Sequence, residues 1–276
     1  MTSRGEQEAA IRRFYDSIVE KEHGRLHESP FELAVTLRFI RKYLRPGMHL
    51  LDVACGTGRY AEALLDAGFC VGAGDLADAN VRVTKALLSR AGDFGDRLRF
   101  VRQGNALDAS AYAGGPWDGI LLLGPCYHLP DRSDRIAVLK QARAHLRSGG
   151  RVYAGFVSRI APFWWGLQHR PEGILEADGV RSLLASGSAF NFAAPGTGLP
   201  HGYYCDPGEL DGLFGEAGLV VEHLCGTEAV FGGRVSSFHQ LEKPLQEAWL
   251  KVVTENCEAP VFVWASEHLL VVAKAD

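Results

Sequence analysis

Short runs of apolar residues alternate with stretches of helical periodicity along most of the chain. Within residues 6–20 the apolar side chains recur three or four positions apart, which predicts an amphipathic helix. A second helix is predicted to begin at Ser29-Pro30, where serine caps and proline fits the first turn, and to run to about Leu44. Pro46-Gly47 then breaks the chain before the first predicted strand.

From residue 48 the pattern becomes a repeat of strand followed by helix. Predicted strands cover residues 48–53, 70–73, 98–103, 119–123 and 151–157, and predicted helices cover 58–67, 78–91 and 134–146. A helix over 207–217, a strand over 219–225, a helix over 241–256 and a strand over 267–274 follow. Such repetition favours parallel strands joined by right-handed crossovers, so we predict an α/β protein with a doubly wound sheet.

Residues 158–203 interrupt this repeat and are rich in aromatic residues, glycine and proline. A structureless loop of that length is unusual in a compact domain, so we predict a small inserted cap. The predicted organisation is an N-terminal helical segment over 1–45, a core over 46–157 and 204–276, and the cap over 158–203.

Composition and charge narrow the class of protein. Hydrophobic residues make up 47% of the chain, which allows a substantial core, and the formal net charge is -4. No long basic run is present, so we expect no nucleic-acid partner, and no apolar run is long enough to span a membrane. The polar start is unlike a secretory signal, so we expect a cytoplasmic protein, monomeric or homodimeric. The six cysteines are scattered without a Cys-x-x-Cys pair, so no metal site is predicted.

The segment from Leu50 to Gly58 lies where a predicted strand meets a predicted helix. Ligands of open α/β sheets bind outside the carboxyl ends of the strands, and Gly56 and Gly58 let the backbone turn sharply and approach a ligand. The glycine spacing alone is compatible with a dinucleotide and with a sulfonium cofactor. Asp52 would set an uncompensated negative charge beside a pyrophosphate, which disfavours a dinucleotide and hydride chemistry.

Two polar residues follow the next strands. Asp75 ends the second predicted strand, where a carboxylate can accept the ribose hydroxyls of a nucleoside cofactor. Asn105 follows the third strand, where its amide could pair with an adenine edge. The alternatives are an acid at a helix N-terminus for Asp75 and a turn residue for Asn105.

Six segments spread over nearly the whole chain carry a further signal: Phe14-Tyr15-Asp16, Arg25-Leu26, the 50–58 loop, Leu123-Gly-Pro-Cys-Tyr-His-Leu129, Leu146-Arg-Ser-Gly-Gly150 and Tyr203-Tyr-Cys-Asp-Pro-Gly-Glu-Leu210. Together they resemble bacterial class I S-adenosylmethionine-dependent methyltransferases that act on small molecules. The resemblance implies a Rossmann-like, seven-stranded doubly wound sheet, S-adenosyl-L-methionine as cofactor, and Asp52 facing the aminoacyl end of that cofactor. The implied cofactor contacts are Tyr15, Arg25, Asp52, Ala54, Cys55, Gly56, Gly58, Asp75, Leu76, Asn105, Ala106 and Leu123. Cys205 departs from the resemblance, which leads us to expect histidine there.

The segment from Gly124 to His128 separates the chain from enzymes that methylate nucleobase amines. Those enzymes grip the amine with Asn or Asp followed by Pro-Pro-Tyr, and here glycine occupies the Asn or Asp position. Base methylation is therefore disfavoured.

His128 is the first candidate general base, because it follows the fourth predicted strand at the edge where the transferable methyl group should lie. His201 is the second, and a pocket-shaping role is the alternative for both. Residues predicted to contact the substrate are Tyr127, Arg159, Trp164, Trp165, Tyr203 and Tyr204. We predict methyl transfer to an O or N atom of a small, partly hydrophobic molecule, of the kind met in natural-product biosynthesis. A nucleic-acid base methyltransferase and a non-catalytic cofactor-binding module of the same fold are the alternatives.

Overall fold

Within residues 4–187 and 202–275, which the computed structural model describes (with the backbone alone for 20–22 and 25–28), seven strands form one sheet. Their order is β3-β2-β1-β4-β5-β7-β6, with β1 to β5 paired in parallel and β7 antiparallel to both of its neighbours. The strands are β1 (His49–Asp52), β2 (Cys70–Asp75), β3 (Leu98–Gln103), β4 (Trp117–Leu122), β5 (Leu146–Val157), β6 (Leu219–Gly226) and β7 (His268–Ala275). The predicted seven-stranded α/β fold is therefore confirmed.

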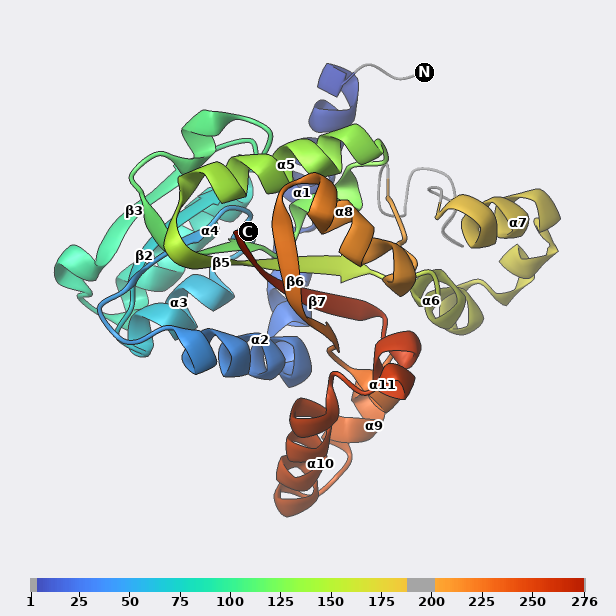
Figure 1. Ribbon diagram of the computed structural model, residues 1–276. Helices are drawn as coiled ribbons and strands as arrows, with labels where there is room; N and C mark the ends of the chain where they lie inside the picture. The colour runs from blue at the N-terminus through green and yellow to red at the C-terminus, as the bar shows by residue number, and fades with distance from the viewer. Residues whose placement is uncertain (1–3, 188–201, 276) are drawn as a thin grey trace.

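Helices cover both faces of the sheet, as Figure 1 shows. One face carries α5 (Arg132–His145) and α8 (Leu210–Glu216), and the other carries α2 (Pro30–Tyr43), α3 (Arg59–Asp66) and α4 (Asp78–Ala91). Alternate residues of β7 show the division, because Leu269 and Val271 pack with the α5 and α8 side whereas Leu270 and Val272 pack with the α2 and α3 side. Strands β1, β2, β4 and β7 are thus buried on both faces, as their apolar runs require, whereas the edge strand β3 is partly exposed.

Helix α1 (Arg4–Glu28) lies across the edge of the sheet where the parallel strands end. Its Glu8 accepts a hydrogen bond from Asn105, which follows β3, at 3.0 Å. Its Asp16 accepts one from the backbone N–H of Ala79 in α4 at 3.1 Å. These bonds place one face of α1 over the loops that carry the predicted cofactor residues.

The structure differs from the predicted elements at several places. Helix α1 runs eight residues past the predicted end at residue 20, through a polar stretch without apolar periodicity. Strand β5 begins at Leu146 instead of residue 151, because Leu146 pairs with Trp117 ahead of a register shift. Four α-helices of the described ranges were not predicted: α9 (Val235–His239) and α11 (Pro260–Ala265), and within the predicted cap α6 (Ala161–His169) and α7 (Ala177–Ser186).

The predicted cap is described only in part. It contains α6 and α7 (Ala177–Ser186), which project beside the sheet in Figure 1, while residues 188–201 lie outside the described residues. The remaining helix is α10 (Lys243–Asn256), close to its predicted bounds. None of the helices in the described ranges has the length and hydropathy needed to cross a bilayer.

Candidate active site

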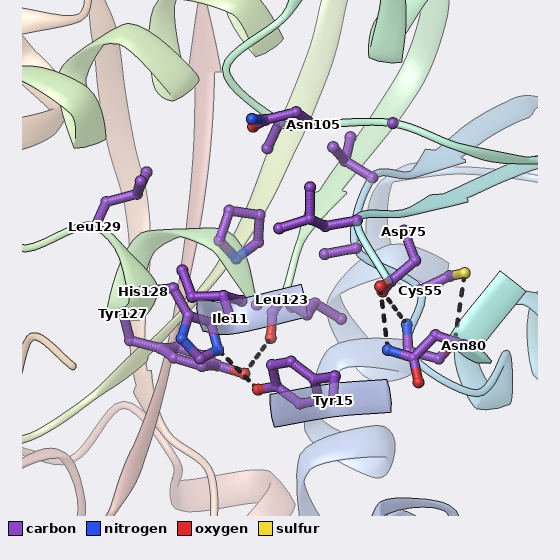
Figure 2. A pocket seen from close by; sticks show the side chains of 18 of the residues that line it. Ile11, Tyr15, Cys55, Asp75, Asn80, Asn105, Leu123, Tyr127, His128 and Leu129 are labelled. Atoms are coloured by element: carbon purple, nitrogen blue, oxygen red, sulfur yellow. Dashed lines mark hydrogen bonds between the residues drawn. The ribbon is translucent and has the colours of Figure 1, made fainter. Parts of the chain in front are cut away.

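A cavity of about 150 Å³ opens where the strand order reverses. Strand β1 lies between β2 and β4, so the loops that follow β1 and β4 diverge at the carboxyl edge of the sheet. Most residues predicted to contact the cofactor line this cavity, namely Tyr15, Ala54, Cys55, Gly56, Asp75, Leu76, Asn105, Ala106 and Leu123. Figure 2 labels five of them, Tyr15, Cys55, Asp75, Asn105 and Leu123, around the cavity.

Asp75 fixes the glycine loop against the end of β2. Its carboxylate accepts hydrogen bonds from the backbone N–H of Gly56 at 2.9 Å, the backbone N–H of Ala77 at 2.9 Å and the side-chain amide of Asn80 at 3.1 Å. Burial raises the pKa of Asp75 to about 6, although these three bonds lower it. A carboxylate has about four lone-pair sites, so three donors leave room for about one further donor. The prediction that Asp75 takes both ribose hydroxyls therefore exceeds its free capacity.

The two glycines of the loop have different roles. Gly56 has φ 54° and lines the cavity, so its backbone can approach a ligand. Gly58 has φ 91°, and a Cβ at that position would lie 2.8 Å from Cγ2 of Thr84. Gly58 is not among the lining residues and packs closely against α4, so its contact with a ligand stays a prediction.

Asp52 is a buried acid whose carboxyl group is left without hydrogen bonds in the described part of the chain. It is 1% exposed, and neither carboxyl oxygen has a hydrogen-bond partner within the described part of the chain. Burial, followed by the charge of Asp75, raises the pKa of Asp52 to about 8. Asp52 stands directly behind the cavity wall at Val53 instead of lining it. A cationic ligand suits such an acid, and S-adenosylmethionine carries positive charge on its ammonium and sulfonium groups.

Both polar atoms of the Asn105 side-chain amide are already hydrogen-bonded. Its nitrogen donates to Glu8 at 3.0 Å, and its oxygen accepts from the backbone N–H of Leu107 at 3.0 Å. The bond to Leu107 is that of a turn residue, the alternative raised by the sequence. Pairing with an adenine edge would require Asn105 to release Glu8.

His128 and Tyr15 form a hydrogen-bonded pair inside the cavity. His128 ends the short helix Pro125–His128 after β4, is 7% exposed, and places Nε2 2.7 Å from the Tyr15 hydroxyl (Figure 2). The two rings meet edge-on with centroids 5.3 Å apart. Tyr127 also lines the cavity, and its hydroxyl donates to the Leu123 carbonyl at 3.3 Å. His128 thus lies at the cavity, as expected from its place after β4, and its role as base stays a prediction.

Three residues predicted to bind substrate are engaged elsewhere. The Arg159 guanidinium donates to the Leu184 carbonyl at 2.9 Å and so ties α7 to the end of β5. Trp164 lies under the Arg234 guanidinium at 4.3 Å from its ring centroid, and Trp165 stacks on a neighbouring histidine of α6. None of the three is among the residues lining the cavity, so their contact with a substrate stays a prediction that this cavity does not support.

Tyr203 and Tyr204 are also packing residues in this structure. The Tyr203 hydroxyl donates to Glu209, and the Arg135 guanidinium lies 3.5 Å from its ring centroid. Tyr204 is 5% exposed in a small cluster with residues of β5, α6 and α7. Cys205, found where histidine was expected, is fully buried and its backbone N–H donates to the Val157 carbonyl at 2.8 Å. Neither tyrosine lines the cavity.

Two further predictions fall outside what the structure describes. His201 belongs to residues 188–201, and Arg25 lies in α1 where only the backbone is described. Their roles as second base and as cofactor contact stay predictions.

Two features of the cavity were missed from the sequence. Asn80 lines the cavity from the first turn of α4, donates to Asp75, and has a buried side-chain oxygen without a partner within the described ranges. Glu32 and His268 also line the cavity and meet the buried Glu228, with the ligand atoms of all three within 4.8 Å of one another. An asparagine five residues after Asp75 was a usable signal, whereas the acid–histidine cluster has no local pattern.

The geometry of the cavity by itself indicates a class of protein. A strand-order reversal, a glycine loop bonded to a carboxylate at the end of β2, and a cavity beside them are features of a Rossmann-like enzyme that binds a nucleoside cofactor.

Comparison with known proteins gives the family. Residues 50–150 match a family described as a methyltransferase domain. A ubiquinone biosynthesis O-methyltransferase of Xanthomonas axonopodis pv. citri is 26% identical over 196 residues, which cover 70% of this chain and 71% of that protein. A ribosomal RNA small subunit methyltransferase H of Dinoroseobacter shibae is 42% identical over 86 residues, 31% of this chain and 25% of that protein.

Among solved structures, Burkholderia thailandensis 1,6-didemethyltoxoflavin-N1-methyltransferase with bound 1,6-didemethyltoxoflavin and S-adenosylhomocysteine is similar in fold. Its TM-score is 0.62 at 18% sequence identity, over 100% of this chain and 92% of that one. These comparisons support a class I S-adenosylmethionine-dependent methyltransferase, with the methyltransferase domain at residues 50–150.

Proposed function

We propose that this enzyme methylates an oxygen or nitrogen atom of a small, partly hydrophobic molecule, with His128 as general base. The observation that carries the proposal is the pair of His128 and Tyr15, joined at 2.7 Å inside the cavity. When bound, S-adenosylmethionine supplies a methyl group on a sulfonium sulfur. The displacement needs little covalent work from the protein, so alignment of the reactants supplies much of the rate, about 7–11 kcal/mol of the barrier in favourable cases.

Tyr15 holds the imidazole in place for proton transfer. The Tyr15 hydroxyl donates to the single lone pair of Nε2, so a hydroxyl or N–H that enters the cavity gives its proton to the Tyr15 oxygen while Tyr15 passes its own proton to Nε2 of His128. His128 is 7% exposed, so this exchange takes place away from bulk water. A positioned base contributes about 10²–10⁴-fold to such a step.

The names of the similar proteins include both an oxygen and a nitrogen atom as methyl acceptor. One is named for O-methylation in ubiquinone biosynthesis, and the similar structure is named for N1-methylation. The match to the ribosomal RNA enzyme covers only 31% of this chain. A Cβ at Gly124 would lie 3.2 Å from Cβ of Ala54, so this backbone leaves little space for the Asn or Asp that grips a nucleobase amine. A small-molecule acceptor is therefore favoured over a nucleic acid.

His128→Gln tests the proposal, with the exposed His239→Gln as matched control. Calorimetry with S-adenosylhomocysteine measures cofactor affinity, and transfer of a tritiated methyl group to a panel of phenols and nitrogen heterocycles measures turnover. We expect H128Q to lose at least 100-fold in turnover and less than about twofold in cofactor affinity, and H239Q to keep both. An unchanged rate in H128Q would remove His128 as base. Cofactor binding without product from any acceptor would favour a non-catalytic module.

A further inference from the structure

The acid–histidine cluster, defined as Glu32, Glu228 and His268, lies at the far end of the cavity from Asp75. Glu32 is in the first turn of α2, Glu228 follows β6, and His268 opens β7. Asp75 ends β2. Three strands, β1, β4 and β5, lie between β2 and β7 in the sheet. His128 follows β4, between these two ends. If the ribose is held at β2 and the proton is taken beside β4, the acceptor extends from there toward β7.

A second, smaller cavity continues in that direction. Glu32 and His268 line both cavities, and the smaller one runs past Leu123 to the paired strands β5 and β7, where Phe156, Leu269 and Thr227 line it. The cluster therefore lies where the two cavities meet.

The cluster is held rigidly on one side only. Glu228, which is 4% exposed, bonds Nδ1 of His268 at 2.5 Å and accepts from the His268 backbone N–H at 3.0 Å. Thr227 donates from its backbone N–H and its hydroxyl to the His268 carbonyl, at 3.0 and 3.1 Å. By contrast, neither Nε2 of His268 nor the Glu32 carboxylate has a hydrogen-bond partner in the described ranges, and Glu32 approaches Nδ1 only to 3.6 Å. If the cluster only joined the loop after β6 to β7, the bonds between Glu228 and His268 would suffice. Neither Nε2 of His268 nor the Glu32 carboxylate would be needed for that role.

The charge of the cluster limits what it can bind. Burial lowers the pKa of His268, but the charges of Glu32 and Glu228 outweigh it and raise the pKa to about 10, so the ring carries a proton on both nitrogens at neutral pH. Two carboxylates and one imidazolium leave a net charge of about −1, and the pKa of the adjacent Glu267 is raised by its burial. An acceptor with a carboxylate or phosphate at this end would be repelled.

A metal ion fits the cluster less well than an organic ligand does. Two atoms bound to one ion at about 2.1 Å lie about 3 Å apart or more. Nδ1 and the Glu228 oxygen are 2.5 Å apart and joined by a hydrogen bond, which occupies the lone pair that an ion would need.

Resting on the proposed methyl transfer, we propose that His268 and Glu32 recognise the methyl acceptor. Nε2–H of His268 donates to an oxygen of the acceptor, and the Glu32 carboxylate accepts from an adjacent N–H or O–H. The class of acceptor is an uncharged, largely apolar molecule with a carbonyl-type oxygen next to such a donor, as in a cyclic amide or a hydroxy-carbonyl compound. Glu228 is a positioning residue that fixes the ring through Nδ1.

The test uses 2-pyridone as the probe, because it carries N–H and carbonyl oxygen on adjacent atoms, and N-methyl-2-pyridone as the probe without the donor. Binding to the complex of full-length protein and S-adenosylhomocysteine is measured by calorimetry or ligand-observed NMR. The variants are a matched pair. His268→Asn keeps an amide donor near the Nδ1 position, and His268→Gln keeps one near the Nε2 position.

We expect H268N to lose at least tenfold in affinity for 2-pyridone and H268Q to keep most of it. The N-methyl probe should bind wild type at least tenfold more weakly than 2-pyridone, and Glu32→Ala should remove that difference. Equal binding of 2-pyridone by H268N and wild type, or no binding by the wild-type complex at millimolar concentration, would overturn the inference alone. Failure of wild type to bind S-adenosylhomocysteine would overturn the proposed function and the inference with it.

Discussion

Replacing Asp52 with asparagine should remove a pH dependence of stability that this one acid imposes. The pKa of Asp52 rises from 3.8 to about 8 because the carboxyl is buried and lies near the charge of Asp75. Below about pH 4 the acid is protonated in the folded and the unfolded chain, so it has no effect on stability. Between about pH 4 and 8 the unfolded chain ionises while the folded protein keeps its proton, and each unit removes about 1.4 kcal/mol of folding free energy. The four-unit window sets an upper limit of about 6 kcal/mol.

Urea unfolding followed by tryptophan fluorescence at pH 5, 6, 7 and 8 measures this effect. Asn is neutral and places polar groups where the neutral acid does. The free energy of unfolding of Asp52→Asn should therefore exceed that of wild type only slightly near pH 4, and the difference should grow by about 1.4 kcal/mol per pH unit up to pH 8. All other titrating groups are shared, so the difference isolates Asp52. The exposed Asp96→Asn should follow wild type at every pH. Parallel stability curves for D52N and wild type would refute the reasoning.

Three further substitutions test the walls of the cavity. Gly58→Ala should destabilise by about 2–4 kcal/mol, because φ is 91° and the new Cβ would lie 2.8 Å from Cγ2 of Thr84. Adding Thr84→Ser, which keeps the hydroxyl bond to Gly56 and removes Cγ2, should recover part of the loss in urea unfolding, and no recovery would exclude that contact as the cause. Asp75→Asn should weaken S-adenosylhomocysteine binding at least tenfold in calorimetry, because an amide offers fewer acceptor sites than the three donors require. Tyr15→Phe should lower turnover about tenfold by freeing the His128 ring, and a wild-type rate would show that the 2.7 Å bond has no part in catalysis.

Residues at the ends of the early strands could be placed from the sequence, because parallel strands of one sheet all end at the same edge. Asp75 and His128 lie beside the cavity for that reason. Residue type was a poorer guide in the predicted cap. Aromatic and basic residues suggested a substrate wall, but Trp164 lies against Arg234, and Tyr203 against Arg135. The same affinity of rings for cations that makes such residues good ligands also makes them good packing partners, and sequence alone does not separate the two.

The acid–histidine cluster could not be predicted, because it depends on the direction of β7. His268 is the first residue of that strand, and in a parallel strand a first residue lies at the edge opposite the cofactor. Strand β7 is inserted antiparallel between β5 and β6, with His268 paired to Val157 at the end of β5, so its first residue reaches the carboxyl edge. The loop after β6 ends at the same edge and brings Glu228 to it. The periodicity of residues 267–274 gives the strand but carries no information on its direction. The reversal of this one strand therefore supplies the cavity with charged groups at the end beside β7.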